Sequence, residues 1–246
     1  MKAQLYNADC FEIFPEIADA SVDAIICDLP YGKTNCAWDS ALPLEDLWAA
    51  YKRIIKPNGA IVLFGIEPFS SMLRLSNLNW FRYDWIWDKV KGTGFLNAKK
   101  QPMRNHEIIS VFYNKQCTYN PIKTMGHERK TSCRKKEDPS EIYNPTLHDN
   151  FYDSTERYPR SIQVFSTDTQ KEALHPTQKP IALLEYLVMT YTNDGDLVLD
   201  NCMGSGTTGL ACKNLGRRFI GIEKEQKYFE IAKQRILMGQ QSLFSD

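Results

Sequence analysis

The chain has 246 residues, of which 43% are hydrophobic and 24% charged, so it is typical of a globular protein and not of a disordered or fibrous one. This length suits one α/β domain with an insertion, or two small domains. No apolar run reaches the roughly 18 residues that a membrane-spanning helix needs, and no signal-peptide pattern opens the chain. We therefore expect a cytoplasmic protein that contacts no membrane.

Charge is unevenly distributed along the chain. The totals cancel at 30 basic and 30 acidic residues, yet the stretch from Lys89 to Lys136 holds twelve Lys or Arg against two acids, Glu107 and Glu128. The rest of the chain therefore carries 18 basic and 28 acidic residues. Such asymmetry indicates a surface that faces a polyanion. A solvated basic face is the alternative.

The cysteines indicate a reducing compartment and no metal site. The chain has seven cysteines and no C-x-x-C pair, which favours free, mostly buried thiols. Cys117, His127, Cys133 and His148 fall in one stretch, but their spacing matches no standard zinc-ligand pattern. We therefore predict no bound metal.

Hydrophobic periodicity predicts alternating strands and helices over most of the chain. Strands are expected over 4–9, 22–28, 60–65, 83–89, 106–113, 196–200 and 218–223, and helices over 11–19, 44–55, 180–191, 207–216 and 227–236. This alternation is typical of a doubly wound, mostly parallel sheet. The segment 115–165 is polar and proline-rich, and we expect an irregular insertion there. The expected parts are thus 1–114, 115–165 and 166–246.

A glycine-rich turn follows the strand that ends at Asp200. Gly204, Gly206 and Gly209 form a G-x-G-x-x-G pattern, and Glu223 ends the next strand. This arrangement is typical of nucleotide binding, where the backbone approaches the ligand and the acid bonds ribose hydroxyls. The glycines alone are also explained by a tight turn. A carboxylate at Asp200 would repel a pyrophosphate and attract a sulfonium, which favours S-adenosylmethionine over NAD.

A second candidate site is the tetrapeptide Asp28-Leu29-Pro30-Tyr31, which follows the apolar strand expected over 22–28. Ligands of open α/β sheets bind at the carboxyl ends of strands. A carboxylate, a rigid backbone and an aromatic ring suit a planar substrate that bears an amine. An ordinary turn is the alternative reading.

These motifs resemble those of DNA amino-methyltransferases. DLPYG resembles the (Asp/Asn/Ser)-Pro-Pro-Tyr catalytic motif, and LDNCMGSGTTG the glycine-rich cofactor motif. HPTQKP, from His175 to Pro180, is similar to the segment before that glycine motif, and GIEKEQKYFEIAKQRI to the second cofactor strand and helix. The catalytic motif comes first, as in the circularly permuted beta class. The resemblance covers roughly residues 1–113 and 156–238.

The resemblance implies a permuted, Rossmann-like methyltransferase sheet and assigns roles to named residues. Cofactor contacts are implied for Asp9, Cys10, His175, Thr177, Gln178, Lys179, Asp200, Met203, Gly204, Ser205, Gly206, Thr207 and Glu223. Two positions depart from the family pattern. Leu29 stands where proline is usual, although its carbonyl can still accept a hydrogen bond, and Asn201-Cys202 replaces Pro-Phe.

The implied reaction moves a methyl group from S-adenosylmethionine to an exocyclic amine of a base in double-stranded DNA. Asp28 and the Leu29 carbonyl would accept the two amine hydrogens, and Tyr31 would stack on a flipped base. In the family, Asp at the first motif position accompanies adenine-N6 enzymes. The same chemistry on cytosine N4, a non-catalytic DNA-binding module and an NAD-dependent oxidoreductase are the alternatives, although the last leaves DLPYG and HPTQKP unexplained.

The basic stretch is the expected contact with DNA phosphates. The candidates are Lys99, Lys100, Arg104, Arg129, Lys130, Arg134, Lys135 and Lys136. Segment 115–165 is the expected target-recognition region. A homodimer and a cognate restriction endonuclease stay open as partners, because no sequence feature shows either interface.

Overall fold

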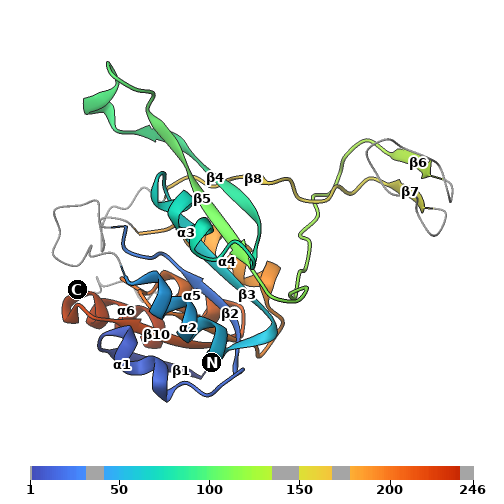
Figure 1. Cartoon of the computed structure of the whole chain (residues 1–246). Coiled ribbons are helices and arrows are strands. Elements are labelled where there is room, and N and C mark those ends of the chain that lie inside the picture. Colours follow the sequence, from blue (N-terminus) through green and yellow to red (C-terminus); the bar gives the residue numbers. More distant parts are fainter. Residues whose placement is uncertain (1, 32–41, 135–149, 168–177, 239–246) are drawn as a thin grey trace, which may run out of the picture. The chain divides into compact units, whose positions relative to one another are not determined.

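A computed structural model describes residues 2–31, 42–134, 150–167 and 178–238 of the chain (Figure 1). The chain divides into two compact units. The larger unit comprises Met1–Asn120 and Ser161–Asp246, and the smaller unit is Pro121–Arg160.

The larger unit is built on an eight-stranded sheet with the order β1-β10-β9-β2-β3-β5-β4-β8. Its first five strands are parallel: β1 (Ala3–Asn7), β10 (Arg218–Glu223), β9 (Leu197–Asp200), β2 (Val22–Cys27) and β3 (Ile55–Gly65). The hairpin of β4 (Phe81–Thr93) and β5 (Arg104–Phe112) adds antiparallel pairing to β3, and β8 (Ile162–Val164) runs parallel to β4. The predicted mostly parallel sheet is confirmed.

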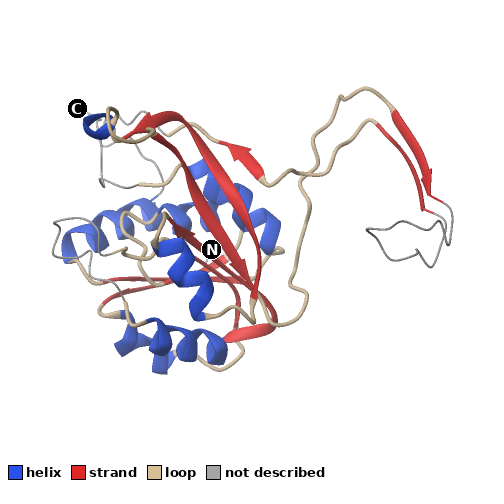
Figure 2. Ribbon diagram, turned by 45° about the horizontal axis from the view of Figure 1, so that its top comes forward, coloured by secondary structure: helices blue, strands red, loops and turns tan. Residues whose placement is uncertain are grey.

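Helices cover both faces of this sheet (Figure 2). One face packs against α1 (Cys10–Ile13), α2 (Leu44–Ile54) and α3 (Phe69–Ser76), and the other against α4 (Ile181–Tyr191), α5 (Thr207–Asn214) and α6 (Gln226–Met238). Successive side chains of a strand point to opposite faces. Accordingly Ile26 packs on the α4–α6 side and Ile25 on the α1–α3 side. Burial on both faces explains why residues 24–27 of β2 are a continuous apolar run.

The pairing of β2 with β9 joins distant parts of the chain. Ala24 and Ile25 pair with Val198 and Leu199, and the Leu197 backbone N–H donates to the Asp23 carboxylate at 2.9 Å across 174 residues of sequence. Because these strands are parallel, their carboxyl ends meet at one edge of the sheet. The predicted catalytic and cofactor motifs, which follow β2 and β9, are thereby brought together.

Several elements differ from the prediction, and the helix predicted over 11–19 is only α1 followed by a 3-10 turn over Phe14–Glu16. Strand β3 begins at Ile55 rather than at 60, and α3 was not predicted. In the segment 115–165, predicted to be irregular, β6 (Lys130–Arg134) and β7 (Asn150–Ser154) pair antiparallel and β8 pairs with β4, so the prediction is wrong for these strands. Strands β6 and β7 are mostly polar, and an Arg129–Asp153 ion pair reinforces their pairing. Their sequences therefore show no periodic hydrophobic pattern from which strands could be predicted.

The larger unit also has two short 3-10 turns. The first, η1 (Phe14–Glu16), follows α1, and the second, η2 (Phe95–Asn97), lies between β4 and β5. Figure 1 shows the β4–β5 hairpin, with η2 at its tip, extending beyond the helices that flank the sheet. Among the helices that the structure describes, none is long and apolar enough to cross a membrane.

Tyr191 provides a stability test, because its buried hydroxyl ties α4 to β4. It accepts a hydrogen bond from Trp85 Nε1 at 2.6 Å and lies 3.0 Å from the Tyr83 hydroxyl. Tyr191→Phe would leave the Trp85 N–H buried without an acceptor, so we expect a loss of about 1–3 kcal/mol in the free energy of unfolding, measured by urea denaturation.

Tyr186 on the same helix supplies the matched control. Its hydroxyl is buried and has no hydrogen-bond partner within the described residues. We therefore expect Tyr186→Phe to be neutral or stabilising. Equal losses in the two variants would contradict the assigned role of the Tyr191 hydroxyl.

Candidate active site

A cavity of about 580 Å³ opens where the parallel strands end. Its wall combines the segment after β2, the glycine turn after β9, the end of β10 and the beginning of α1. Residues of β4 and β5 complete it on the far side of β3. This volume lies within the range of about 300–1,000 Å³ that is typical of small-molecule sites.

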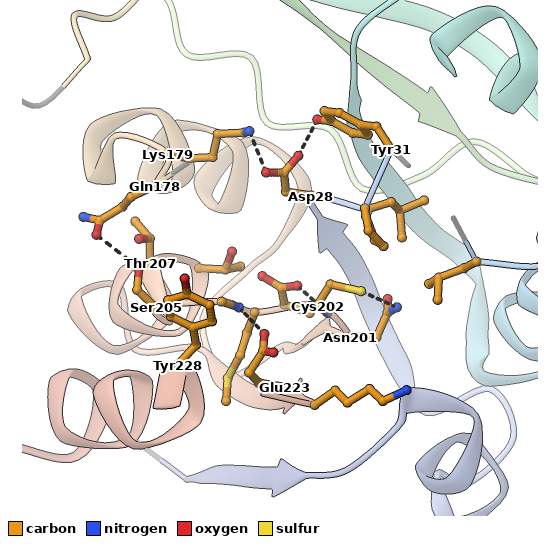
Figure 3. A pocket seen from close by; sticks show the side chains of 18 of the residues that line it. Asp28, Tyr31, Gln178, Lys179, Asn201, Cys202, Ser205, Thr207, Glu223 and Tyr228 are labelled. Atoms are coloured by element: carbon orange, nitrogen blue, oxygen red, sulfur yellow. Dashed lines mark hydrogen bonds and ion pairs between the residues drawn. The ribbon is translucent and has the colours of Figure 1, made fainter. Parts of the chain in front are cut away.

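Asp28 stands at the centre of one half of this cavity (Figure 3). One carboxylate oxygen accepts a hydrogen bond from the Tyr31 hydroxyl, and the other accepts from Lys179 Nζ at 2.6 Å. The Tyr31 ring packs against Phe69 of α3, with 5.0 Å between ring centroids. Both oxygens of Asp28 are therefore held by neighbouring side chains.

Lys179 links the half-buried Asp28 to a buried carboxylate, Glu107. Its Nζ lies 3.1 Å from Glu107 Oε2, and the other Glu107 oxygen forms an ion pair with Lys89. Burial raises the pKa of Asp28, which Lys179 partly opposes. Burial would also raise the pKa of Glu107, but Lys179 and Lys89 together lower it below its usual range. Against its own burial, the pKa of Lys179 is raised by the two carboxylates, so it remains an ammonium.

The glycine turn forms the other half of the cavity, and the protein itself occupies four of its backbone N–H groups. The N–H of Gly204 donates to Glu223 Oε2 at 2.9 Å, and that of Cys202 to Asp200 Oδ1 at 3.2 Å. The N–H groups of Met203 and Gly206 donate to backbone carbonyls. Phosphate-binding turns instead point such N–H groups at the ligand. These four N–H groups are therefore not directed at a ligand.

Carboxylates line this half of the cavity. Burial raises the pKa of Asp200 to about 6, and it raises the pKa of Glu223 as well. Asp9 caps α1 by accepting from the Phe11 N–H at 3.0 Å and pairs with Lys224. A cavity with several carboxylates favours a cationic ligand.

Most predicted site residues line this one cavity. The residues that it brings together are Asp9, Cys10, Asp28, Leu29, Pro30, Tyr31, Gln178, Lys179, Asp200, Met203, Gly204, Ser205, Thr207 and Glu223. Gln178 also accepts a hydrogen bond from the Ser205 hydroxyl at 3.1 Å, which joins the segment before α4 to the glycine turn (Figure 3). His175 and Thr177 lie outside the described residues.

Gly206 has a different place from the one expected for a cofactor contact, because it packs against α6 rather than lining the cavity. Pro180, expected as the first helical residue, is the N-cap of α4. Asn201, at the position where proline is usual in the resembled motif, is buried and accepts a hydrogen bond from Tyr51 of α2 at 2.5 Å.

The predicted DNA contacts are spread over several elements. Lys99 and Lys100 are exposed near the tip of the β4–β5 hairpin, whereas Arg104 borders the cavity. In the smaller unit, Lys130 and Arg134 lie on β6 and Arg129 pairs with Asp153. Lys135 and Lys136 lie outside the described residues.

Sequence reasoning missed Glu107, Lys89 and Tyr228 as cavity residues. The sequence contains one feature that could have indicated the role of Glu107, which is a lone acid at the start of the apolar run of β5. A carboxylate in such a run is rarely buried without a partner or a role. For Lys89 and Tyr228 the sequence contains no such feature, because their contribution depends on which strands and helices lie side by side.

The sheet and cavity define a Rossmann-like α/β protein with a ligand site at the carboxyl ends of its strands. The model of the DNA methylase family that acts at N6 or N4 matches residues 22–234. The type II methyltransferase M.HinfI of Haemophilus influenzae is 30% identical over 279 residues, covering 94% of this chain and 67% of that protein. The chain thus belongs to the N6/N4 family of DNA methylases, and it is a DNA methyltransferase.

Solved structures share this architecture. The crystal structure of the M1.HpyAVI–SAM complex superposes with a TM-score of 0.64 at 28% identity, covering 96% of this chain and 99% of that chain. The cytosine-N4-specific PvuII DNA methyltransferase superposes with a TM-score of 0.68 at 16% identity, covering 100% and 89%. The PvuII likeness shows the fold alone.

The packing of Gly206 leads to a prediction. Its φ is +78°, and a Cβ there would lie 2.8 Å from Ala232 Cβ and 3.0 Å from Ala232 Cα on α6. Gly216 has a similar φ of +74° with nothing within 4 Å. We expect Gly216→Ala to cost about 1–2 kcal/mol of backbone strain in urea denaturation. Gly206→Ala should cost about 1–3 kcal/mol more, because overpacking is added. Equal losses in the free energy of unfolding of the two variants would contradict the predicted overpacking, because they would show that α6 can move away from the added Cβ at no cost.

Proposed function

We propose that this protein transfers a methyl group from S-adenosylmethionine to the N6 amine of an adenine flipped out of double-stranded DNA. The observation that carries the proposal is the placement of Asp28 in the same cavity as the glycine turn. One half of the cavity suits a cationic donor, and the other half offers acceptors for an amine.

The described residues fit S-adenosylmethionine. This cofactor supplies an electrophilic methyl group on a sulfonium and carries no phosphate. Occupied backbone donors in the turn and carboxylates at Asp200 and Glu223 suit such a ligand, and they disfavour the pyrophosphate of NAD. We assign the ribose hydroxyls to Glu223 and the cationic methionine portion to the side of Asp200. Gln178, bonded to Ser205, would close this half of the cavity.

The residues after β2 would prepare the acceptor amine. An adenine amine is a weak nucleophile because its lone pair is delocalised into the ring. Asp28 and the Leu29 carbonyl would each accept one amine hydrogen, which directs the lone pair and holds the nitrogen in place. The target atom is unreachable inside a duplex, so the base must leave the stack, and Tyr31 would lie against its ring.

The choice of adenine rests on Asp28. In the family that the sequence resembles, Asp at the first motif position accompanies adenine-N6 enzymes. The cavity itself has acceptors that would serve the N4 amine of cytosine equally well. The identity of the methylated base is therefore the quantity to measure.

An isotope-transfer experiment tests the proposal. Unmethylated DNA is incubated with the protein and labelled S-adenosylmethionine, then digested to nucleosides. We expect the label on N6-methyladenine. Asp28→Ala should lower the transfer rate by at least about 10²-fold, because one acceptor of the amine is lost, while cofactor binding measured by calorimetry changes little. Label on N4-methylcytosine would overturn the base assignment, and wild-type turnover in Asp28→Ala would overturn the catalytic one.

DNA contacts are proposed for the basic stretch, and target recognition for segment 115–165, which contains the smaller unit Pro121–Arg160. Lys99 and Lys100 are exposed at the hairpin tip, and between Lys89 and Arg104 the sequence holds no acid. Exposed cations without acidic neighbours are suited to phosphate contacts.

Salt dependence of DNA binding tests this assignment. The logarithm of the association constant should fall linearly with the logarithm of salt concentration, by about 0.9 per phosphate contact. We expect the double variant Lys99→Ala/Lys100→Ala to reduce the slope by about 2 in fluorescence anisotropy titrations. The control is Lys227→Ala/Lys233→Ala, two exposed lysines on α6 outside the basic stretch. Equal slopes in both double variants would remove the hairpin tip from the interface.

A further inference from the structure

Lys179 lies at the proposed catalytic carboxylate rather than in the glycine-turn half of the cavity. Its side chain is 9% exposed, and its Nζ is 2.6 Å from Asp28 Oδ2 and 3.1 Å from Glu107 Oε2. In Figure 3 it reaches Asp28 from the segment before α4, while the neighbouring Gln178 side chain points to Ser205. The two adjacent residues therefore serve different halves of the cavity.

Glu107 extends this contact into a cluster of four charges, which we call the charge quartet: Asp28, Lys89, Glu107 and Lys179. The Lys89 and Glu107 side chains are 12% and 10% exposed and form an ion pair. Two cations balance two carboxylates, and four different segments of the chain supply them. Buried charges require such balance, because a buried charge without a partner is costly.

We propose that Lys179 is a positioning residue that holds Asp28 as an oriented, charged acceptor, and that Glu107 limits this hold by sharing the same ammonium. The inference rests on the proposed function. Lys179 and Tyr31 each bond one oxygen of Asp28, which defines the plane of the carboxylate. Each oxygen has a further lone pair, so the carboxylate can still accept from a target amine. A protonated Asp28 would lose acceptor capacity.

The proposal predicts that the pKa of Asp28 shifts in opposite directions when Lys179 and when Glu107 loses its charge. The charged or titratable groups that act on Asp28 are Tyr31, Lys179 and Glu107, with Asp200 and Cys202 beyond them on the β9 side. Burial raises the pKa of Asp28, and Lys179 opposes that rise while Glu107 adds to it. Removing the cation should raise this pKa further, and removing the anion should lower it.

The experiment measures the single-turnover rate of methyl transfer to DNA from about pH 5 to pH 9, at saturating cofactor and DNA. Activity is lost on the acid side as Asp28 gains a proton. We call this acid side of the pH–rate profile the acid limb. In Lys179→Met we expect the acid limb to move to higher pH by about one unit. At a fixed pH on the limb the rate should therefore be about tenfold lower than in the wild type, and it should recover as the pH rises. In Glu107→Gln the limb should move to lower pH.

Two further variants separate this role from a structural one. Lys56→Met removes an ion pair of the same 2.6 Å length, with Asp23 near the other end of β2, and should leave the limb in place. Lys179→Arg keeps the charge and should keep the limb near its wild-type position, whatever its rate. A merely structural quartet would lower the rate equally at every pH in both Lys179→Met and Glu107→Gln, and that result overturns the proposal.

Folding and function are controlled separately. If circular dichroism shows that Lys179→Met is unfolded, the near-isosteric Glu107→Gln decides alone, and an unmoved or upward-shifted limb refutes the inference. A wild-type protein that transfers no methyl group to DNA at any pH would instead refute the proposed function. A wild-type protein that is active, with unmoved limbs in the variants, would refute only the role of Lys179 and Glu107.

Discussion

The parallel pairing of β2 with β9 is the constraint on which the site depends. It joins Asp23 to Leu197 across 174 residues and places the ends of both strands at one edge of the sheet. Asp28 and Asp200 follow those ends, so two motifs at opposite ends of the chain form one cavity. A shift of one residue in this register would turn every β2 side chain to the opposite face of the sheet and exchange Ile25 and Ile26 between the two helix layers.

Electrostatic balance then divides the cavity into two halves with different chemistry. In the glycine turn, the Glu223 and Asp200 carboxylates each accept from a backbone N–H group, so these two donors are used within the protein. Around Asp28, two lysines offset the buried Glu107 and the half-buried Asp28. The same physical rule, that buried charges need partners, thus gives an anionic half suited to a cation and a neutral half that retains acceptors for an amine.

Much of the fold could be predicted because its signals are local. The apolar runs of β2, β3 and β9, the helical spacing in α2 and the glycine turn each follow from a few adjacent residues. The β6–β7 pair could not be predicted, since polar strands held by an ion pair and a backbone ladder carry no periodic pattern. Gly206 shows that a local motif can also fail to predict the surroundings of a single residue. Its place in the motif indicated a ligand contact, whereas its environment is the surface of α6.

The sequence by itself determined the fold class, the two motifs of the site and, through them, membership of the N6/N4 methylase family, because each depends on short runs of residues with fixed spacing. Only the tertiary structure decided that Lys179 belongs to Asp28 and that Glu107 and Lys89 complete the charge quartet. The physical reason is distance along the chain: Lys179 and Asp28 are 151 residues apart. An ion pair between such residues exists only once the sheet has placed β2 and β5 on either side of β3 and the start of α4 at their ends.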